Sequence, residues 1–465
     1  MKIQFCGGAQ TVTGSQHLIF VNGKKILMEC GLFQGRRSET YEKNRNFMYD
    51  PKSLDAVLLS HAHIDHSGNI PNLVKAGYDG PIYATAATVD LCQFLFRDTA
   101  HLQEKDIEWV NKINRRKHHP PAEPLYSLAE AENSLSSFVG IQYNKPYKIF
   151  QGLTVTYYDA GHILGSAGLL LEINDNGRKW RLGFSGDIGR NDMPIIQDPN
   201  YLWDLDILIM ESTYGNRSHG SIEDASEELA KVARQVASAG GKLIIPAFAV
   251  GKTQLLVYML HKLFDQNRIP DMPIFVDSPL ACNATDVFRM HPECFDSETQ
   301  RIFLHENNDP FGFGRLKYIR EVEDSKKLND LKYPHIIISG SGMAEGGRIL
   351  HHLRNNIENH KNIVLFVGYA AAETLARKLM DGEKMIRIFG EEHQVKCQIK
   401  TMDFFSAHAD KDGLIDYVKG TSPEKLKYIF LVHGEPDQSL PLKEALKSRD
   451  YRSVEYPAPN DIYTI

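Results

Sequence analysis

The chain has 465 residues, a formal net charge of −6, 42% hydrophobic residues and 24% charged residues. This length exceeds one compact core, so two domains are expected, and the composition is that of an ordinary soluble globular protein. The negative charge argues against a protein that coats nucleic acid non-specifically. The sequence has neither an apolar run of about 18 residues nor a secretory leader, so a cytoplasmic protein is expected.

The first part of the chain alternates short apolar runs with turn residues. β-Branched and aromatic residues punctuated by Gly or Asp are typical of strands, and the runs are QHLIFV, KILMECG, DAVLLS, GPIYATA, LTVTYYDAG, GLLLEI and WRLGFSGD. A polar, proline-bearing segment, INRRKHHPPAEP (113–124), is predicted to be a surface loop. The six cysteines are scattered without a CxxC spacing, so free buried thiols are expected.

After about Tyr201, strand-like runs alternate with helical patterns. SIEDASEELAKVARQVASAGG predicts a helix that Ser221 caps and Gly240–Gly241 ends. The apolar runs on either side of it favour a parallel α/β sheet, and His-bearing turns return near Met402 in FFSAHAD and LVHGEP. We therefore predict an α/β protein in which a second domain, residues 202–388, is inserted between residues 1–201 and 389–465 of the first.

The stretch HAHIDH follows the apolar run DAVLLS and carries four potential metal ligands, His61, His63, Asp65 and His66. Neutral imidazole and carboxylate are the usual ligands of a catalytic divalent metal. One site rarely takes four ligands from six residues and still leaves room for a substrate. Two adjacent sites explain the spacing better, whereas a solvated polar turn would explain a lone histidine.

Further ligands are expected at the ends of other apolar strands. DAGHILGS supplies His162, FSGDIGR supplies Asp187, whose carboxylate could bridge two ions, and LVHGEP supplies His433. Taken singly, a strand-end histidine is more often a structural residue than a ligand. Together with HAHIDH, these three residues predict a two-metal centre.

The same motifs resemble those of a known family. HAHIDH, the GH of DAGHILGS and the GD of FSGDIGR look like the signature of metallo-β-lactamase-fold hydrolases. MESTYGNR, IPAFAVGKTQ, SGSGMAEGGRILHHL, FFSAHAD and LVHGE look like the additional motifs of the β-CASP branch. That branch comprises nucleic-acid nucleases, including the cleavage subunit of messenger-RNA 3′-end processing and its minimal bacterial and archaeal relatives. The resemblance covers essentially the whole chain, in the expected order, and is to the minimal form.

The resemblance implies a fold, a metal and a ligand set. The fold is an αββα metallo-β-lactamase sandwich with an inserted parallel α/β β-CASP domain. The cofactor is two Zn²⁺ per chain, one held by His61, His63 and His162, the other by Asp65, His66 and His433, with Asp187 between them. An HxExD variant, which looks more like the diiron flavoproteins of this superfamily, is absent, and its absence favours zinc over iron.

The catalytic residues implied by the resemblance lie in two further motifs. Two metals about 3.5–4 Å apart can neutralise a phosphodiester and activate water, but the departing sugar oxygen then needs an acid. His408, which matches motif B, is the candidate acid. Glu211, which matches motif A, would accept a hydrogen bond from it and raise its pKa. Without the family match, Glu211 is equally well a helix-entry or salt-bridge carboxylate. Asp65 is counted with these catalytic residues, and the expected products are a 5′-phosphate and a 3′-hydroxyl.

Other motifs are less specific. Glu29, in LMECG, stands where related sequences usually show Asp, and it is similar to a group that orients ligands without being one. AVGKTQ ends like a Walker A motif, but Pro246 stands where that motif needs Gly, so ATP binding is not expected. In GYAAAETLARKL, Ala370 and Glu373 replace the Gln and Gly usual in the family, with an unpredicted effect on the substrate channel.

The segment SGSGMAEGGRILHHL is predicted to bind substrate. It follows the strand HIIIS and opens a helix, so its backbone amides could cradle a phosphate, with a tight structural turn as the alternative. Two side chains of the helix could face the groove, with a solvated helix face as the alternative. The predicted substrate-binding residues are Ser339, Gly340, Ser341, Gly342, Met343, Arg348 and His351.

The leading prediction is a zinc-dependent nuclease that acts on single-stranded RNA. His433 at motif C resembles the RNA branch, whereas an aliphatic residue there resembles the DNA-repair branch. The alternatives are a DNA-directed nuclease, a small-molecule hydrolase of the thioesterase or lactonase type, and an inactive scaffold, which the presence of all seven ligands disfavours. No membrane partner is expected, and a homodimer follows from resemblance alone.

Overall fold

The structure, a computed structural model, describes residues 1–35, 37–306, 308–368, 370–371, 373–402, 404 and 406–465. Tyr369 and Ala372 of GYAAAETLARKL and Phe405 of FFSAHAD therefore lie outside the described residues. The chain divides into two compact units: unit 1 comprises residues 1–192, 198–218 and 408–465, and unit 2 comprises residues 193–197 and 219–407.

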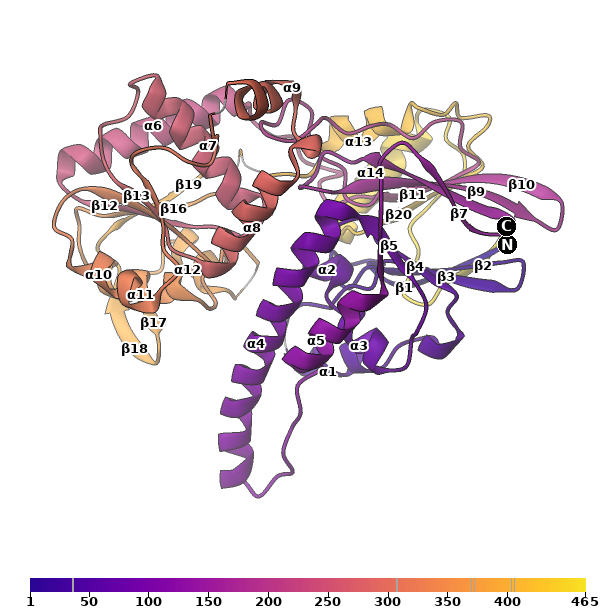
Figure 1. Ribbon diagram of the computed structural model, residues 1–465, viewed down its shortest axis with the longest axis horizontal. Helices are drawn as coiled ribbons and strands as arrows, with labels where there is room; N and C mark the ends of the chain where they lie inside the picture. Colours follow the sequence, from indigo (N-terminus) through magenta and orange to yellow (C-terminus); the bar gives the residue numbers. More distant parts are fainter. Residues whose placement is uncertain (36, 307, 369, 372, 403, 405) are drawn as a thin grey trace. The chain divides into compact units, whose positions relative to one another are not determined.

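Unit 1 is built on two sheets (Figure 1), each of seven strands in the described part of the chain. The first has the order β22-β1-β2-β3-β4-β5-β6, with bounds Ile462–Thr464, Lys2–Gly7, Gln16–Val21, Lys24–Met28, Ala56–Leu58, Ile82–Thr85 and Phe138–Ile141. The second has the order β21-β20-β11-β10-β9-β8-β7, with bounds Val454–Glu455, Tyr428–Val432, Ile207–Glu211, Arg178–Phe184, Ala167–Asp175, Leu153–Asp159 and Pro146–Phe150.

The two sheets of unit 1 pack face to face with helices on their outer faces. Alternate residues of the strands meet in the core between the sheets, where Phe5, Ile19, Tyr157, Phe184 and Phe430 are fully buried or nearly so. A second core joins the outer face of the second sheet to α13 (Lys411–Val418) and α14 (Pro436–Lys447). The remaining helices of unit 1 are α1 (Arg37–Arg45), α2 (Ile64–Ser67), α3 (Ile70–Lys75), α4 (Ala86–Arg116) and α5 (Leu128–Ser134). This arrangement is the predicted αββα sandwich.

Unit 2 is a parallel sheet with helices, as predicted. Its strands have the order β14-β13-β15-β12-β16-β19, with bounds Leu316–Tyr318, Ile274–Val276, His335–Ser339, Lys242–Pro246, Ile363–Phe366 and Gln398–Thr401. Neighbouring strands in this order pair in parallel. Strands buried on both faces read as continuous apolar runs, and β13 and β16 are buried at every residue. A hairpin of β17 (Met385–Ile388) and β18 (Glu391–Gln394) is separate.

The helices of unit 2 are α6 (Ile222–Ala239), α7 (Lys252–Asp265), α8 (Pro279–Met290), α9 (Ser297–Gln300), α10 (Val322–Lys327), α11 (Arg348–Asn356) and α12 (Leu375–Met380). The predicted caps of α6 are confirmed: the Ser221 side chain accepts a hydrogen bond from Asp224 N, and Gly240 ends the helix with a φ of 68°. Only a residue without a Cβ adopts that left-handed conformation at little cost.

The unit boundaries differ from the expected 201/202 and 388/389. Strand β11 belongs to unit 1, because it pairs in parallel with both β10 and β20. Strand β19 belongs to unit 2, because it pairs in parallel with β16. Both pairings join strands that are distant in sequence or separated by a loop, so the local pattern of residues could not place them.

Three further features bear on the predictions. The segment 113–124 is only partly a loop, because α4 continues through Arg116. All six cysteines are buried free thiols, as expected. Of the helices that the structure describes, none is both long enough and apolar enough to cross a membrane.

Candidate active site

The predicted ligands come from segments that leave strands at one edge of unit 1. HAHIDH follows β4, with His63 capping α2, and His162, Asp187 and His433 follow β8, β10 and β20. Strands β10, β11 and β20 run parallel, and β8 has the same direction because β9 is antiparallel to both β8 and β10. Their carboxyl ends therefore share an edge, as ligand-bearing loops of layered folds commonly do.

Three imidazoles converge with one carboxylate oxygen. His63 Nδ1 lies 3.1 Å from His61 Nε2 and 3.2 Å from His162 Nε2. Asp187 Oδ2 lies 3.5 Å from the Nε2 atoms of both His61 and His162. Burial lowers the pKa of His61 and of His162 well below the usual value, so both rings are neutral, as metal ligands must be.

A second group converges beside the first. His66 Nε2 lies 3.2 Å from His433 Nε2, and His433 Nε2 lies 3.4 Å from Asp65 Oδ2. Asp187 Oδ1 lies 3.3 Å from His66 Nε2 and 3.4 Å from His433 Nδ1. The two oxygens of Asp187 thus face the two groups separately, and the structure brings all seven predicted ligands together in unit 1.

Proton positions in this cluster fit metal ligation. The Ser60 hydroxyl donates its one proton to Glu29 Oε2 (2.9 Å), so at 2.9 Å from His61 Nδ1 its oxygen must accept the proton of that ring nitrogen. Thr213 Oγ1 donates to the carbonyl oxygen of His433 (2.9 Å), so it likewise accepts from His433 Nδ1 (3.0 Å). In both rings Nε2 is left with a free lone pair that points into the cluster.

Asp187 supplies an independent test of the fit. Among the described residues, no group makes a hydrogen bond to its buried Oδ1 atom. A buried carboxylate oxygen without a donor is costly, whereas a bound cation would satisfy it. The lone pairs of the imidazoles and this oxygen together fit divalent metal ions.

Glu29 supports the ligands from behind. Its carboxylate accepts hydrogen bonds from Ser60 N (2.6 Å) and Ser60 Oγ (2.9 Å), and its Oε2 lies 2.5 Å from His66 Nδ1. Glu29 is fully buried and its φ is 62°, an uncommon value for a residue other than glycine. It therefore orients His66 directly and His61 through Ser60, and the sequence did not indicate the contribution of Ser60 or Thr213.

Replacing Glu29 by Gln is expected to weaken metal binding about 10- to 100-fold. Gln keeps the size of the side chain but turns one acceptor oxygen into an amide that faces donors, so His66 and Ser60 lose their partner. Competition with a chromophoric chelator measures the affinity. Glu172→Gln, on the exposed side of β9, is the matched control, and equal affinities in the two variants would show that Glu29 does not position the ligands.

Glu211 and His408 form a pair beside the cluster. His408 Nδ1 lies 3.0 Å and 3.2 Å from the two Glu211 oxygens, and His408 Nε2 lies 4.0 Å from Asp187 Oδ2. A backbone bridge between His408 and Gly189 holds the histidine beside the loop that carries Asp187. Burial alone would lower the pKa of His408, but the Glu211 carboxylate raises it to about 9. The carboxylates of Glu211 and Asp187 thus favour the protonated ring, whose Nε2 lies on the side of the ligands.

The predicted phosphate cradle lies in unit 2 and is not a helix N-terminus. Strand β15 ends at Ser339 and α11 begins only at Arg348. Ser341 N donates to Gly346 O (3.1 Å) and Ser341 Oγ accepts from Glu345 N (3.2 Å), so the loop uses these groups internally. The tight-turn alternative describes this loop better, because its polar groups have partners within the turn.

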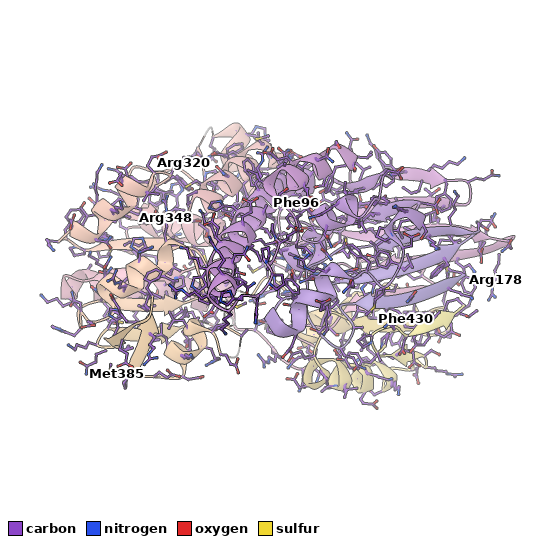
Figure 2. The ribbon with its side chains drawn as sticks, turned by 90° about the horizontal axis from the view of Figure 1, so that it is seen from below. Phe96, Arg178, Arg320, Arg348, Met385 and Phe430 are labelled. Atoms are coloured by element: carbon purple, nitrogen blue, oxygen red, sulfur yellow. The ribbon has the colours of Figure 1, made fainter. Side chains whose placement is uncertain are left out.

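Arg348 and His351 are not placed as expected. The Arg348 guanidinium donates to Asp277 Oδ1 (2.7 Å) and to the carbonyl oxygens of Ile319 (3.2 Å) and Arg320 (2.6 Å). Figure 2 labels Arg320 and Arg348 on neighbouring segments of unit 2. His351 is exposed and its ring lies 4.6 Å from that of Phe389. The Arg348 guanidinium is thus engaged in contacts within unit 2, and these contacts give no support to its predicted place in the substrate groove.

Asp277 is the buried centre of those contacts, and the sequence did not single it out. Its Oδ2 accepts from Ser325 Oγ (2.6 Å) and lies 2.6 Å from His352 Nε2, while Oδ1 accepts from Arg348. Burial would raise the pKa of Asp277, but His352, Ser325 and Arg348 outweigh it and lower that pKa. This carboxylate joins α10 and α11 to the end of β13.

Asp277→Asn is expected to destabilise unit 2 by about 3 kcal/mol, since removing one partner of a buried ion pair leaves the others unpaired. The folded-state pKa is lowered, so the stabilisation is present above the unfolded-state value of about 3.9 and is lost as pH falls through the folded-state value. Hydrogen exchange of the β13 and β15 amides at pH 7 and pH 3 measures it. Asp324→Asn, in an exposed pair with Lys327, is the control; equal exchange in both variants would contradict a structural role.

Three family models match the chain. The Metallo-beta-lactamase superfamily domain matches residues 18–180, the Beta-Casp domain matches residues 253–379, and the Zn-dependent metallo-hydrolase RNA specificity domain matches residues 392–457. The first range lies within unit 1 and the second within unit 2. The matched ranges follow the order of the motifs along the sequence.

Several curated proteins are similar over almost the whole chain. Ribonuclease TTHA0252 of Thermus thermophilus is 34% identical over 97% of this chain and 96% of its own length. The transcription termination factors FttA of Methanocaldococcus jannaschii and Methanothermobacter thermautotrophicus are 30% and 31% identical, over 96% and 100% of this chain and 69% and 71% of their own lengths. A solved structure of a protein of unknown function from Enterococcus faecalis V583 has the same fold, with a TM-score of 0.54 and 13% identity over 100% of this chain and 99% of the other.

Proposed function

The chain belongs to the β-CASP family of metallo-β-lactamase-fold RNA nucleases, and we propose that it is a zinc-dependent ribonuclease that hydrolyses phosphodiester bonds of single-stranded RNA. The observation that carries the proposal is the pair of His/Asp groups that meet at the two oxygens of Asp187. We further propose that unit 2 is the β-CASP domain, inserted into a metallo-β-lactamase domain that unit 1 forms.

The ligand assignment follows the two groups. His61, His63 and His162 would hold one zinc ion, Asp65, His66 and His433 would hold the other, and Asp187 would contact both. Imidazole and carboxylate donors suit zinc, and one of the matching family models is described as zinc-dependent. Two such ions would supply positive charge to a phosphodiester and make water a stronger nucleophile near neutral pH.

His408 is proposed to donate the proton that the departing oxygen needs. An alkoxide is a poor leaving group, so its departure as the 3′-hydroxyl requires a proton in the transition state. His408 holds one on Nε2, since Glu211 accepts the hydrogen bond from Nδ1 and favours the charged ring. Attack of water at phosphorus, with transfer of this proton to the departing 3′-oxygen, would leave a 5′-phosphate and a 3′-hydroxyl.

RNA is preferred over DNA on two grounds. The model that matches residues 392–457 is described as an RNA specificity domain, and that range includes His433. A curated relative that matches nearly end to end is named a ribonuclease. The part of that range from residue 408 onward, which includes His433, lies in unit 1.

A cleavage assay tests the proposal. Zinc-loaded chain is incubated with end-labelled single-stranded RNA and DNA of one sequence, with and without a chelator. Chelator-sensitive cleavage of RNA to products with 5′-phosphates is expected, and the product ladder separates internal cleavage from trimming. Cleavage of DNA alone, or hydrolysis of thioesters or lactones without cleavage of either nucleic acid, would overturn it.

A further inference from the structure

The helix α4 is much longer than the part of unit 1 that it packs against. Its 31 residues correspond to a length of about 46 Å at 1.5 Å per residue. The first half is anchored: Leu91, Leu95 and Phe96 are buried, and the Phe96 ring lies 6.2 Å from that of Phe138 on β6, with Phe96 labelled in Figure 2. In Figure 1 the second half extends beyond α3 and α5. Residues 101–119 are called the α4 arm below.

One face of the α4 arm is held by the chain that follows the helix. Asn111 Nδ2 donates to Ala122 O (3.0 Å), Asn111 Oδ1 accepts from Ala122 N (2.8 Å), and Gln103 Oε1 accepts from Leu125 N (3.1 Å). Ile107, between Gln103 and Asn111 on the same face, is buried. The returning segment therefore braces the arm, which has the rigidity that a defined binding surface needs.

The opposite face carries apolar and cationic side chains in one row. Residues three or four apart lie on one side of a helix, and Leu102, Lys105, Trp109, Lys112 and Arg116 are exposed at this spacing. The acidic residues beside this row are Asp106 and Glu108, and Glu108 pairs with Lys105. Trp109 is 62% exposed and Leu102 is 54% exposed. Trp109 is the most exposed of the three tryptophans of the chain, so its ring is accessible to a partner.

The charge of the α4 arm is opposite to that of the chain. Its end carries Lys112, Arg115, Arg116 and Lys117, and no acidic residue occurs in the sequence from 109 to 122, although the net charge of the chain is −6. All four are exposed, and within the described residues none forms an ion pair with a carboxylate. Ordinary surface cations of this chain, such as Lys326 and Lys327, have acidic partners one turn away.

The start of α4 lies at the candidate active site. Thr85 Oγ1 and Thr88 Oγ1 both donate to Gly165 O, at 2.6 Å and 2.9 Å, in the loop that carries His162. The helix therefore leads from that loop to the cationic end over about 46 Å. A strand stacked as in a duplex, with a rise of about 3.4 Å per nucleotide, spans this distance with about 14 nucleotides, and an extended single strand spans it with fewer.

We propose that the exposed face of the α4 arm is a second contact surface for single-stranded RNA, with phosphates on Lys112, Arg116 and Lys117 and a base stacked on Trp109. Cations that follow a backbone and an aromatic side chain that takes a base are the two elements of single-strand binding without sequence preference. The inference rests on the proposed function, and it extends the RNA contacts of unit 1 away from the ligand cluster.

The test compares variants of the full chain in binding a labelled 30-nucleotide single-stranded RNA across a series of salt concentrations. The zinc-loaded His408→Ala chain is the common background, so that cleavage is slow during the measurement. The arm variant carries Lys112→Ala, Arg116→Ala and Lys117→Ala. The control carries Lys145→Ala, Lys148→Ala and Lys179→Ala, which remove the same charge from exposed positions elsewhere in unit 1.

Each phosphate contact to a single strand contributes about 0.7 to the slope of log affinity against log salt. The slope of the arm variant should therefore be smaller by about 2, while the control keeps the slope of the background chain. Lowering the salt from 1 M to 0.1 M should then strengthen binding about 100-fold less in the arm variant than in the control. Trp109→Ala should weaken binding about tenfold, and Trp109→Phe, which keeps an aromatic face, should restore most of it. With His408 intact, the ratio of kcat/KM for a 30-mer to that for a 4-mer should fall about tenfold in the arm variant.

An arm variant that matches the control in affinity and slope would overturn the proposal. The cationic face of the arm would then be assigned to an acidic protein surface as its partner. Equal loss for the 4-mer and the 30-mer would also overturn it, since a distant contact cannot act on an RNA too short to reach it. Failure of the proposed function would be seen separately, as absence of chelator-sensitive cleavage by the unaltered chain, because the salt slope of binding does not depend on cleavage.

Discussion

The Asp187→Ala chain is expected to lose metal together with activity. Asp187 is the one predicted ligand whose two oxygens approach both groups, at 3.5 Å from His61 and His162 and at 3.3–3.4 Å from His66 and His433. Without Asp187, Asp65 is the only predicted ligand that carries a negative charge. The repulsion between two dications would then be offset by one carboxylate instead of two. We expect fewer than two zinc ions per chain by elemental analysis and cleavage reduced by at least about 10³-fold.

Two controls keep this result interpretable. Asp416→Ala removes a carboxylate that is exposed in an i, i+3 pair with Lys419, and it should retain metal and activity. Asp187→Asn keeps the size of the side chain, so loss of metal in that variant with unchanged circular dichroism would exclude misfolding as the cause. A chain that holds two zinc ions without Asp187 would contradict the bridging role.

The convergence of the candidate ligands could be predicted from sequence because each of their segments follows a strand. The end of an apolar run such as KYIFLV marks the end of a strand. The residue that follows it then lies at the edge of the sheet where parallel strands finish. The four potential ligands within HAHIDH indicated two adjacent metal sites better than one. The rule that parallel strands share an edge brings together His162, Asp187 and His433 of the second sheet. HAHIDH follows β4 of the first sheet, so its approach to them depends on how the two sheets pack.

The supporting groups could not be predicted in this way. Glu29 contacts His66 from 37 positions earlier, and Thr213 contacts His433 from 220 positions earlier. The sequence places Arg348 in the predicted substrate groove, yet its guanidinium donates a hydrogen bond to Asp277, which lies 71 positions earlier. Such pairings depend on how strands order themselves in a sheet, and residue pattern does not determine that order.

The end of α4 was missed for a different reason. INRRKHHPPAEP is polar and contains prolines, which indicate a loop, but its first four residues continue a helix whose apolar face ends earlier. Hydrophobic periodicity detects a helix only where the helix packs. Past Ile107 the arm is stabilised by side-chain hydrogen bonds to the returning chain, such as Asn111 to Ala122, and these leave no periodic apolar signal.

His408→Ala is expected to keep both metals and to lose about 10²- to 10⁴-fold in the rate of cleavage. His408 Nε2 lies 4.0 Å from Asp187 Oδ2, while its Nδ1 is engaged by Glu211, so the ring is placed to donate a proton rather than to complete a ligand set. Glu211, His408 and Asp187 could also be read as a ligand group, and that alternative predicts loss of metal in the same variant. Elemental analysis beside single-turnover kinetics separates the two.

The leaving group provides the sharper test of the acid. At a linkage in which sulfur replaces the 3′-bridging oxygen of RNA, the leaving group departs as a thiolate. A thiolate needs little protonation because thiols have a pKa of about 8.5. His408→Ala should therefore cleave the sulfur linkage nearly as fast as the unaltered chain while remaining slow on the oxygen linkage. Glu211→Gln, which lets the pKa of His408 fall, should show the same selectivity with a smaller loss. An equal loss on both linkages would mean that His408 acts before the bond breaks, in positioning the phosphodiester, and that the proton of the leaving group comes from elsewhere.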